Sequence, residues 1–134
     1  MTKYLMLKHY RGPFTHLYTP GDQWTAEEWD AHIKYMRDFA DRLKETGEYV
    51  SETALSMDGV WVRFDGENNP PLTDGPFAET KDLVAGWMMI DVESHERALN
   101  LAAELSAAPG AGGKAIGEWL ELRPVMHTSL DSSD

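Results

Sequence analysis

Leu83-Val84-Ala85-Gly86-Trp87-Met88-Met89-Ile90-Asp91-Val92 is the stretch that decides the fold of this 134-residue chain. Its side chains are mostly apolar at odd and at even positions, which predicts a strand buried on both faces. Residues 4–10 have the same two-sided character and predict a second central strand. A sheet built around these two strands needs cover on both of its faces.

Two amphipathic segments supply helices for one of those faces. Thr25, with Glu28 three residues later, has the pattern of a capping box, and Gly47 marks a left-handed stop, so a helix is expected up to Thr46. A second helix is expected from the N-cap Ser94 to Ser106. The expected buried stripe of the first helix is Trp29, Ile33, Met36, Ala40 and Leu43.

The remaining segments complete an α+β fold. Residues 49–55 and 60–64 alternate like strands around an Asp58-Gly59 turn, and residues 118–126 alternate as a last strand. The order β-α-β-β-loop-β-α-β is a ferredoxin-like βαββαβ arrangement with an inserted hairpin. Two helices cover one sheet face only, so we expect a homodimer in which the second faces pack together.

Composition excludes several classes of protein. The chain has 12 Lys and Arg against 23 Asp and Glu, a net charge of −11, which disfavours direct nucleic-acid binding. The absence of Cys removes thiolate chemistry and disulfides. With no long apolar run and no leader pattern, we expect no membrane association and a cytoplasmic protein. We expect one domain over 1–127, a disordered tail over 128–134, and a flexible small-residue connection over 107–117.

His32 is the first candidate for chemistry. On a helical wheel it lies about 60° from the centre of the expected stripe, at the border between core and surface. A neutral imidazole there can act as a general base if a carboxylate orients its other nitrogen. The alternative is a boundary histidine bonded to a backbone carbonyl.

Asp74-Gly75-Pro76-Phe77 is the second candidate. Gly75 permits a positive φ, Pro76 fixes the next φ, and Asp74 can bond the amides that follow, so the segment predicts a rigid turn. A carboxylate held in this way is either a turn device or a pre-organised catalytic group. No pair of histidines has metal-ligand spacing, and we assign neither a metal nor a cofactor.

Thr73-Asp74-Gly75-Pro76-Phe77-Ala78-Glu79-Thr80-Lys81, followed by Ala85-Gly86-Trp87, resembles the signature of the DGPF proteins of the YCII-related family. The resemblance extends to residues 3–8, 32–37 and 121–124. It implies a dimeric α+β barrel of ferredoxin-like protomers and a catalytic His–Asp pair. The helix-borne histidine of that family matches His32, and Asp74 is the candidate for the acid.

Two functions follow from the residues and the resemblance together. The first is a cofactor-independent enzyme acting on a small molecule, an isomerase, lyase or hydrolase, with His32 and Asp74 as catalytic residues and Gly75, Pro76 and Phe77 in the substrate-binding turn. The second is a non-catalytic ligand-binding or regulatory dimer, which the resemblance associates with a sigma factor. A third interpretation gives His32 and Asp74 structural roles only.

Overall fold

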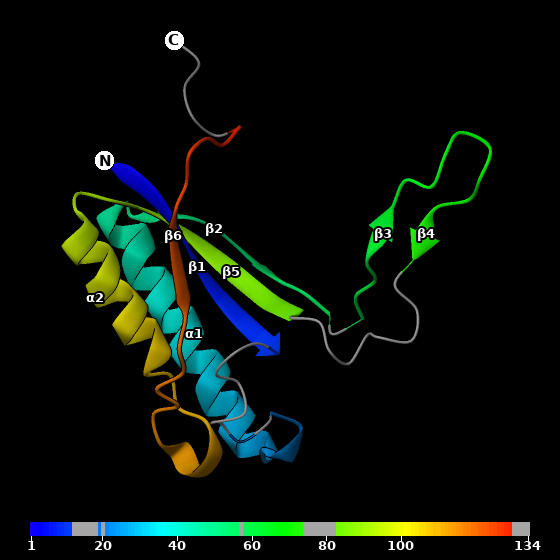
Figure 1. Cartoon of the computed structure of the whole chain (residues 1–134). Helices are drawn as coiled ribbons and strands as arrows, with labels where there is room; N and C mark the ends of the chain where they lie inside the picture. Colours follow the sequence, from blue (N-terminus) through cyan, green and yellow to red (C-terminus); the bar gives the residue numbers. More distant parts are fainter. Residues whose placement is uncertain (12–18, 20, 57, 74–82, 130–134) are drawn as a thin grey trace.

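The computed structural model describes residues 1–11, 19, 21–56, 58–73 and 83–129, and the chain is drawn in Figure 1. Its elements in chain order are β1 (Thr2–Arg11), η2 (Gly21–Gln23), α1 (Ala26–Thr46), β2 (Tyr49–Ala54), β3 (Val62–Arg63), β4 (Leu72–Thr73), β5 (Leu83–Val92), α2 (His95–Ser106), η4 (Ala111–Gly113) and β6 (Glu121–Pro124). The fold is α+β, as predicted.

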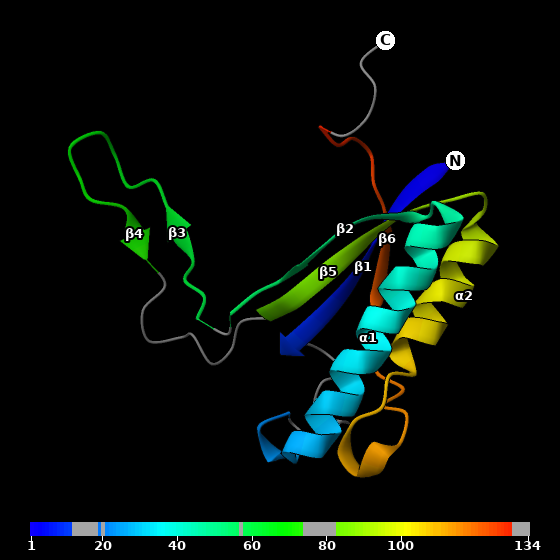
Figure 2. The same cartoon turned by 180° about the vertical axis from the view of Figure 1, so that it is seen from behind.

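The main sheet has four strands in the order β2-β5-β1-β6, and all of its pairings are antiparallel. β1 and β5 form its centre, with Leu5 opposite Met89 and Leu7 opposite Trp87. Both helices lie on one side of this sheet, as the two opposite views show (Figures 1 and 2). The two-sided apolar strands are therefore central, and only one of their faces is covered by helices.

The core lies between the helices and the sheet. Side chains alternate across a strand, so one set from β1 and β5 faces α1 and α2. The fully buried members of this core are Met6, Phe39, Ile90, Val92 and Leu101. The opposite set, Leu5, Leu7, Trp87 and Met89, is half-buried and forms what we call the open face.

The helix boundaries are confirmed by their caps. The Thr25 hydroxyl accepts from the amide of Glu28 at 3.1 Å, and a Glu28 carboxylate oxygen accepts from the amide of Thr25 at 2.7 Å. Gly47 ends α1 with φ 82°, a conformation that favours glycine. At α2 the Ser94 hydroxyl accepts from the amide of Arg97.

The predicted stripe of α1 is wrong at its N-terminal end. Ile33 is 47% exposed and Trp29 is 40% exposed, whereas Phe39 is fully buried. The Trp29 indole does not enter the core and instead donates a hydrogen bond to the carbonyl of Gly21 at 2.8 Å. The buried side of α1 therefore begins at His32 and continues through Phe39.

The predicted hairpin around Asp58-Gly59 is also wrong. β2 pairs with β5, and the segment that we expected to pair with β2 contributes only β3, which pairs with β4. β5 is apolar on both faces and has the longer run of pairing positions, so it takes β2 as its neighbour. We call residues 58–73 the arm; Figures 1 and 2 show it extending away from the helices and the main sheet.

The last strand is shorter than expected, because β6 begins only at Glu121. The amide of Gly117 donates to the carbonyl of Ser106, and the Ser106 hydroxyl donates to the carbonyl of Glu118. These bonds hold residues 117–118 against the end of α2, and the backbone pairing with β1 begins only at Glu121. Residues 130–134, most of the tail that we expected to be disordered, lie outside the described residues.

Candidate functional site

His32 lies on α1, near the point where that helix meets the 107–118 segment. The prediction that it sits at the border of the core is wrong, since only 6% of the residue is exposed. Trp29 and Ile33 are exposed, so the buried side of α1 lies closer to His32 than the sequence predicted. The imidazole is therefore part of the interior of the protomer.

A backbone carbonyl fixes the orientation of this imidazole. His32 Nδ1 lies 3.0 Å from the carbonyl oxygen of Pro109. A carbonyl oxygen only accepts, so the proton is on Nδ1, and in the neutral ring Nε2 carries the lone pair. No described residue forms a hydrogen bond with Nε2. The sequence left two interpretations open, an imidazole oriented by a carboxylate or one bonded to a backbone carbonyl, and at Nδ1 the partner is a carbonyl.

Two tryptophans pack against His32. The Trp24 ring centroid is 5.2 Å from the imidazole and that of Trp29 is 5.7 Å away, both edge-on. The two indoles are held in turn, with Trp24 Nε1 donating to the carbonyl of Thr19 at 3.2 Å and Trp29 donating to Gly21. Sequence reasoning assigned no role to Trp24; the available signal was an aromatic residue immediately before an N-cap.

A charged pair lies on the same side of the sheet. Lys8 follows Tyr4 and Met6 on the helix-facing side of β1, and its Nζ is 3.2 Å from a carboxylate oxygen of Glu118. The Glu118 side chain is largely buried. Neither residue was identified as a site residue from the sequence, because Lys8 and Glu118 are 110 positions apart and only the fold brings them together.

The surroundings hold His32 in its neutral form. Burial lowers the pKa of His32, the positive charge of Lys8 lowers it further, and the Pro109 hydrogen bond partly opposes both. The ordinary pKa of a histidine is near 6.5, so the ring is neutral at pH 7. A neutral imidazole with a fixed tautomer is the form in which histidine acts as a general base.

The 107–117 segment is held against α1, contrary to the expectation of a flexible connection. His32 bonds Pro109, and one turn earlier a Glu28 carboxylate oxygen accepts from the amide of Gly112. The amides of Thr25 and Gly112 lower the pKa of Glu28. A Cβ at Gly110 would lie 2.7 Å from the Ile116 side chain, so the two ends of this segment also pack closely against each other.

The second predicted group cannot be placed against the first. Asp74, Gly75, Pro76 and Phe77 lie outside the described residues. Their assignment as catalytic acid and substrate-binding turn stays a prediction. Within the described part of the chain, no three His, Asp or Glu side chains gather as a metal site would require.

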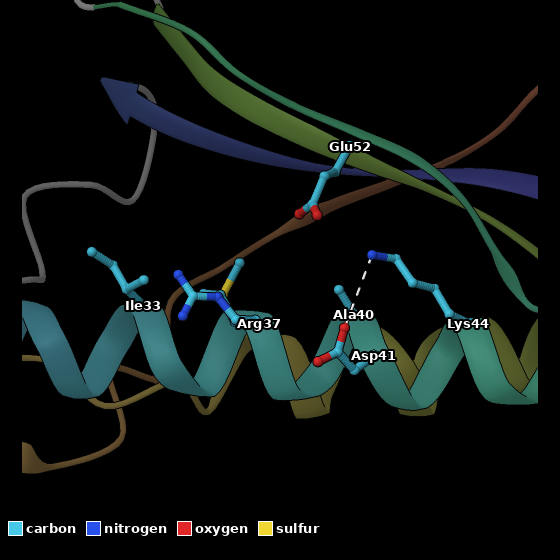
Figure 3. A pocket seen from close by; sticks show the side chains of 7 residues that line it. Ile33, Arg37, Ala40, Asp41, Lys44 and Glu52 are labelled. Carbon is cyan, nitrogen blue, oxygen red and sulfur yellow. Dashed lines mark ion pairs between the residues drawn. The ribbon is translucent and has the colours of Figure 1, made fainter.

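A separate groove of about 450 Å³ runs along α1 beside β2. It is lined by Ile33, Met36, Arg37, Ala40, Asp41, Lys44 and Glu52. Figure 3 shows Glu52 reaching toward the helix from the sheet side, while Asp41 and Lys44 form an ion pair of 3.9 Å. His32 does not line this groove, so a ligand there would not meet the imidazole.

The chain is an α+β protein with a buried, neutral histidine between its first helix and a glycine-rich loop. Residues 2–119 match the model of the YCII-related domain, and the chain belongs to that family. A search of curated proteins gives no match to it. None of the helices in the described ranges is long and apolar enough to cross a membrane.

Proposed function

We propose that the chain is a cofactor-independent enzyme that moves a proton on a small molecule, with Nε2 of His32 as the general base. The hydrogen bond from His32 Nδ1 to the Pro109 carbonyl carries this proposal. It fixes the tautomer that leaves the Nε2 lone pair available, and the lowered pKa keeps the ring neutral. In the reaction, Nε2 would take a proton from the substrate and return it to another substrate atom.

Lys8 supports this role by its charge. Its ammonium group lies close enough to His32 to affect the pKa of the imidazole. Negative charge that develops on a substrate when Nε2 removes a proton would be stabilised by the same ammonium group. This favours substrates whose proton is acidified by a carbonyl, and it fits an isomerase or lyase better than a hydrolase.

Asp74 is proposed as the second catalytic residue, in the turn formed with Gly75, Pro76 and Phe77. Because Pro109 occupies the Nδ1 side of the ring, the carboxylate would act on the Nε2 side or directly on the substrate. Its part would be to bind or protonate the substrate rather than to fix the histidine tautomer.

The finer fold is proposed as ferredoxin-like and dimeric. The strand order β2-β5-β1-β6 with both helices on one face supports the ferredoxin-like arrangement. The open face, with Leu5, Leu7, Trp87 and Met89 half-buried, supports a homodimer in which two such faces pack together. This arrangement is a dimeric α+β barrel.

The alternative is a ligand-binding protein without catalysis. One observation favours it: His32 is almost fully buried and bonded to a carbonyl, which also fits a purely structural histidine. In that case ligands would bind in the α1–β2 groove, which is lined by two cationic side chains, Arg37 and Lys44, and by two carboxylates, Asp41 and Glu52. A regulatory role beside a sigma factor stays a prediction from the family resemblance alone.

Deuterium wash-in separates the two functions. Small 2-oxo acids and β-keto lactones are incubated with the protein in D2O, and loss of the proton signal next to the carbonyl is followed by NMR. His32→Asn keeps a donor near the Nδ1 position and lacks the Nε2 base. Catalysed exchange that this variant loses while staying folded supports the enzyme; exchange equal in both proteins contradicts it.

A further inference from the structure

The arm exposes an unusual density of large apolar side chains. Five of them are between 49% and 74% exposed: Val60, Trp61, Val62, Phe64 and Leu72. Exposed apolar residues that occur singly are ordinary, but a contiguous group of this kind marks an interaction surface. None of the described helices and main-sheet strands covers the group, since the arm extends away from them (Figures 1 and 2).

The arm cannot owe its structure to its own pairing. β3 and β4 have two residues each and are joined by two paired positions, Val62 with Thr73 and Arg63 with Leu72. A two-stranded hairpin is at best marginally stable in water without a surface to pack on. Placing Trp61 and Phe64 in water adds an unfavourable hydration cost that a packed arm would not carry.

We propose that the arm packs on a second copy of this chain, and that it clasps the dimer whose sheets meet through their open faces; this rests on the proposed homodimer. The same chain carries an uncovered apolar sheet face and an uncovered apolar arm held apart from it. In a twofold dimer each copy's arm can cover the other copy, so both surfaces are buried reciprocally.

The open face alone is smaller than the surface that a stable interface buries. The two central strands have 10 residues each and the edge strands have 6 and 4. At roughly 16 Å² of sheet per residue, the face covers roughly 500 Å². A stable interface buries about 800 Å² on each partner. Two reciprocal arms would add to the area that each copy buries.

Charge explains why the partner is a second copy despite the net charge of −11. The charged residues on the open face pair with one another: Lys3 lies 3.7 Å from Asp91, and Arg123 lies 3.8 Å from Glu121. These pairs leave the face close to neutral. Two copies that meet there avoid the repulsion that their acidic helix surfaces would impose.

The test compares the dimer dissociation constant of the unsubstituted protein with that of three variants, by sedimentation. Trp61→Ser combined with Phe64→Ser removes the largest arm side chains and should raise the constant at least about tenfold. Leu99→Ser, at a half-exposed apolar position on α2, should leave it unchanged. Leu7→Glu places a charge in the open face and should abolish the dimer.

Tryptophan emission gives the second readout. The difference between wild-type and Trp61→Phe spectra isolates Trp61, and its emission should shift to shorter wavelength as the dimer forms. A dimer that Leu7→Glu disrupts but that tolerates the arm substitutions, with Trp61 still emitting as in water, overturns the clasp and leaves the sheet dimer intact. A wild-type protein that stays monomeric overturns both.

Discussion

The Nδ1–H of His32 and the carbonyl oxygen of Pro109 are 77 positions apart in sequence and 3.0 Å apart in the structure. This bond joins the second turn of α1 to the loop that follows α2. It makes one side chain both an anchor for the loop and a neutral imidazole whose Nε2 has no hydrogen-bond partner among the described residues. The two roles can be separated by substitution.

Removing the anchor should destabilise the protein. His32→Ala leaves the half-buried carbonyl of Pro109 without this donor and opens a cavity beside Trp24, and we expect a loss of about 2–4 kcal/mol in the free energy of unfolding. His32→Asn, whose side-chain amide can occupy the Nδ1 position, should lose less than half as much. Urea denaturation measures both. Equal losses would show that the Pro109 bond contributes little.

Stability should fall below pH 6.5 because of His32. Its pKa in the folded protein is lowered from 6.5, mainly by burial. The unfolded chain therefore binds a proton there more readily, and the contribution of the neutral ring is complete above pH 6.5 and declines as the pH falls through that value. The unfolding free energy of wild type should drop more steeply between pH 7.5 and 5.5 than that of His32→Asn. Parallel curves would place His32 in a solvent-like environment.

Glu48 and Arg97 should contribute more than an exposed ion pair. Arg97 donates to both carboxylate oxygens of Glu48, at 2.9 and 2.8 Å, and Glu48 is 8% exposed. Arg97→Ala leaves that carboxylate buried with only the Thr46 hydroxyl, so we expect a loss of about 2–3 kcal/mol.

Lys34→Ala is the control for this pair. It breaks the exposed bridge to Asp38 and should cost less than about 0.5 kcal/mol. Thermal and urea unfolding of the two variants give the comparison. Similar losses in both would mean that the burial of Glu48 does not strengthen its pairing.

Gly86 should tolerate no side chain. A Cβ there would lie 2.4 Å from the carbonyl oxygen of Thr53 on the neighbouring strand. Gly86→Ala must push β2 away from β5, and we expect a loss of about 2–3 kcal/mol. Gly112→Ala meets no atom within 4 Å and strains only a φ of 69°, so about 1 kcal/mol is expected. A milder effect at Gly86 than at Gly112 would contradict the close strand approach.

Local signals predicted the helices and the central strands, because caps and two-sided apolar runs act within a few residues. The helix ends are determined by hydrogen bonds and a backbone conformation that involve only neighbouring residues, at Thr25, Glu28, Gly47 and Ser94. Pairing partners depend on competition between distant strands. The 49–55 segment could pair with 60–64 or with β5, and only the whole sheet decides.

The candidate site was predicted only in part, because it too depends on contacts between segments that are distant in sequence. His32 stood out as a polar residue near an apolar stripe, but its depth depends on how Trp29 turns toward Gly21. Pro109, Lys8 and Glu118 reach the site from segments with no local pattern that points to it. Their roles follow from the meeting of β1, α1 and the 107–118 segment.

The most direct test is the protonation state of His32, observed by 15N NMR of the imidazole at pH 7 and through a pH titration. We predict a neutral ring with its proton on Nδ1 and a pKa below 6.5. A ring that carries its proton on Nε2, or that is positively charged at pH 7, would have no lone pair free at Nε2 and would contradict a general base at this position.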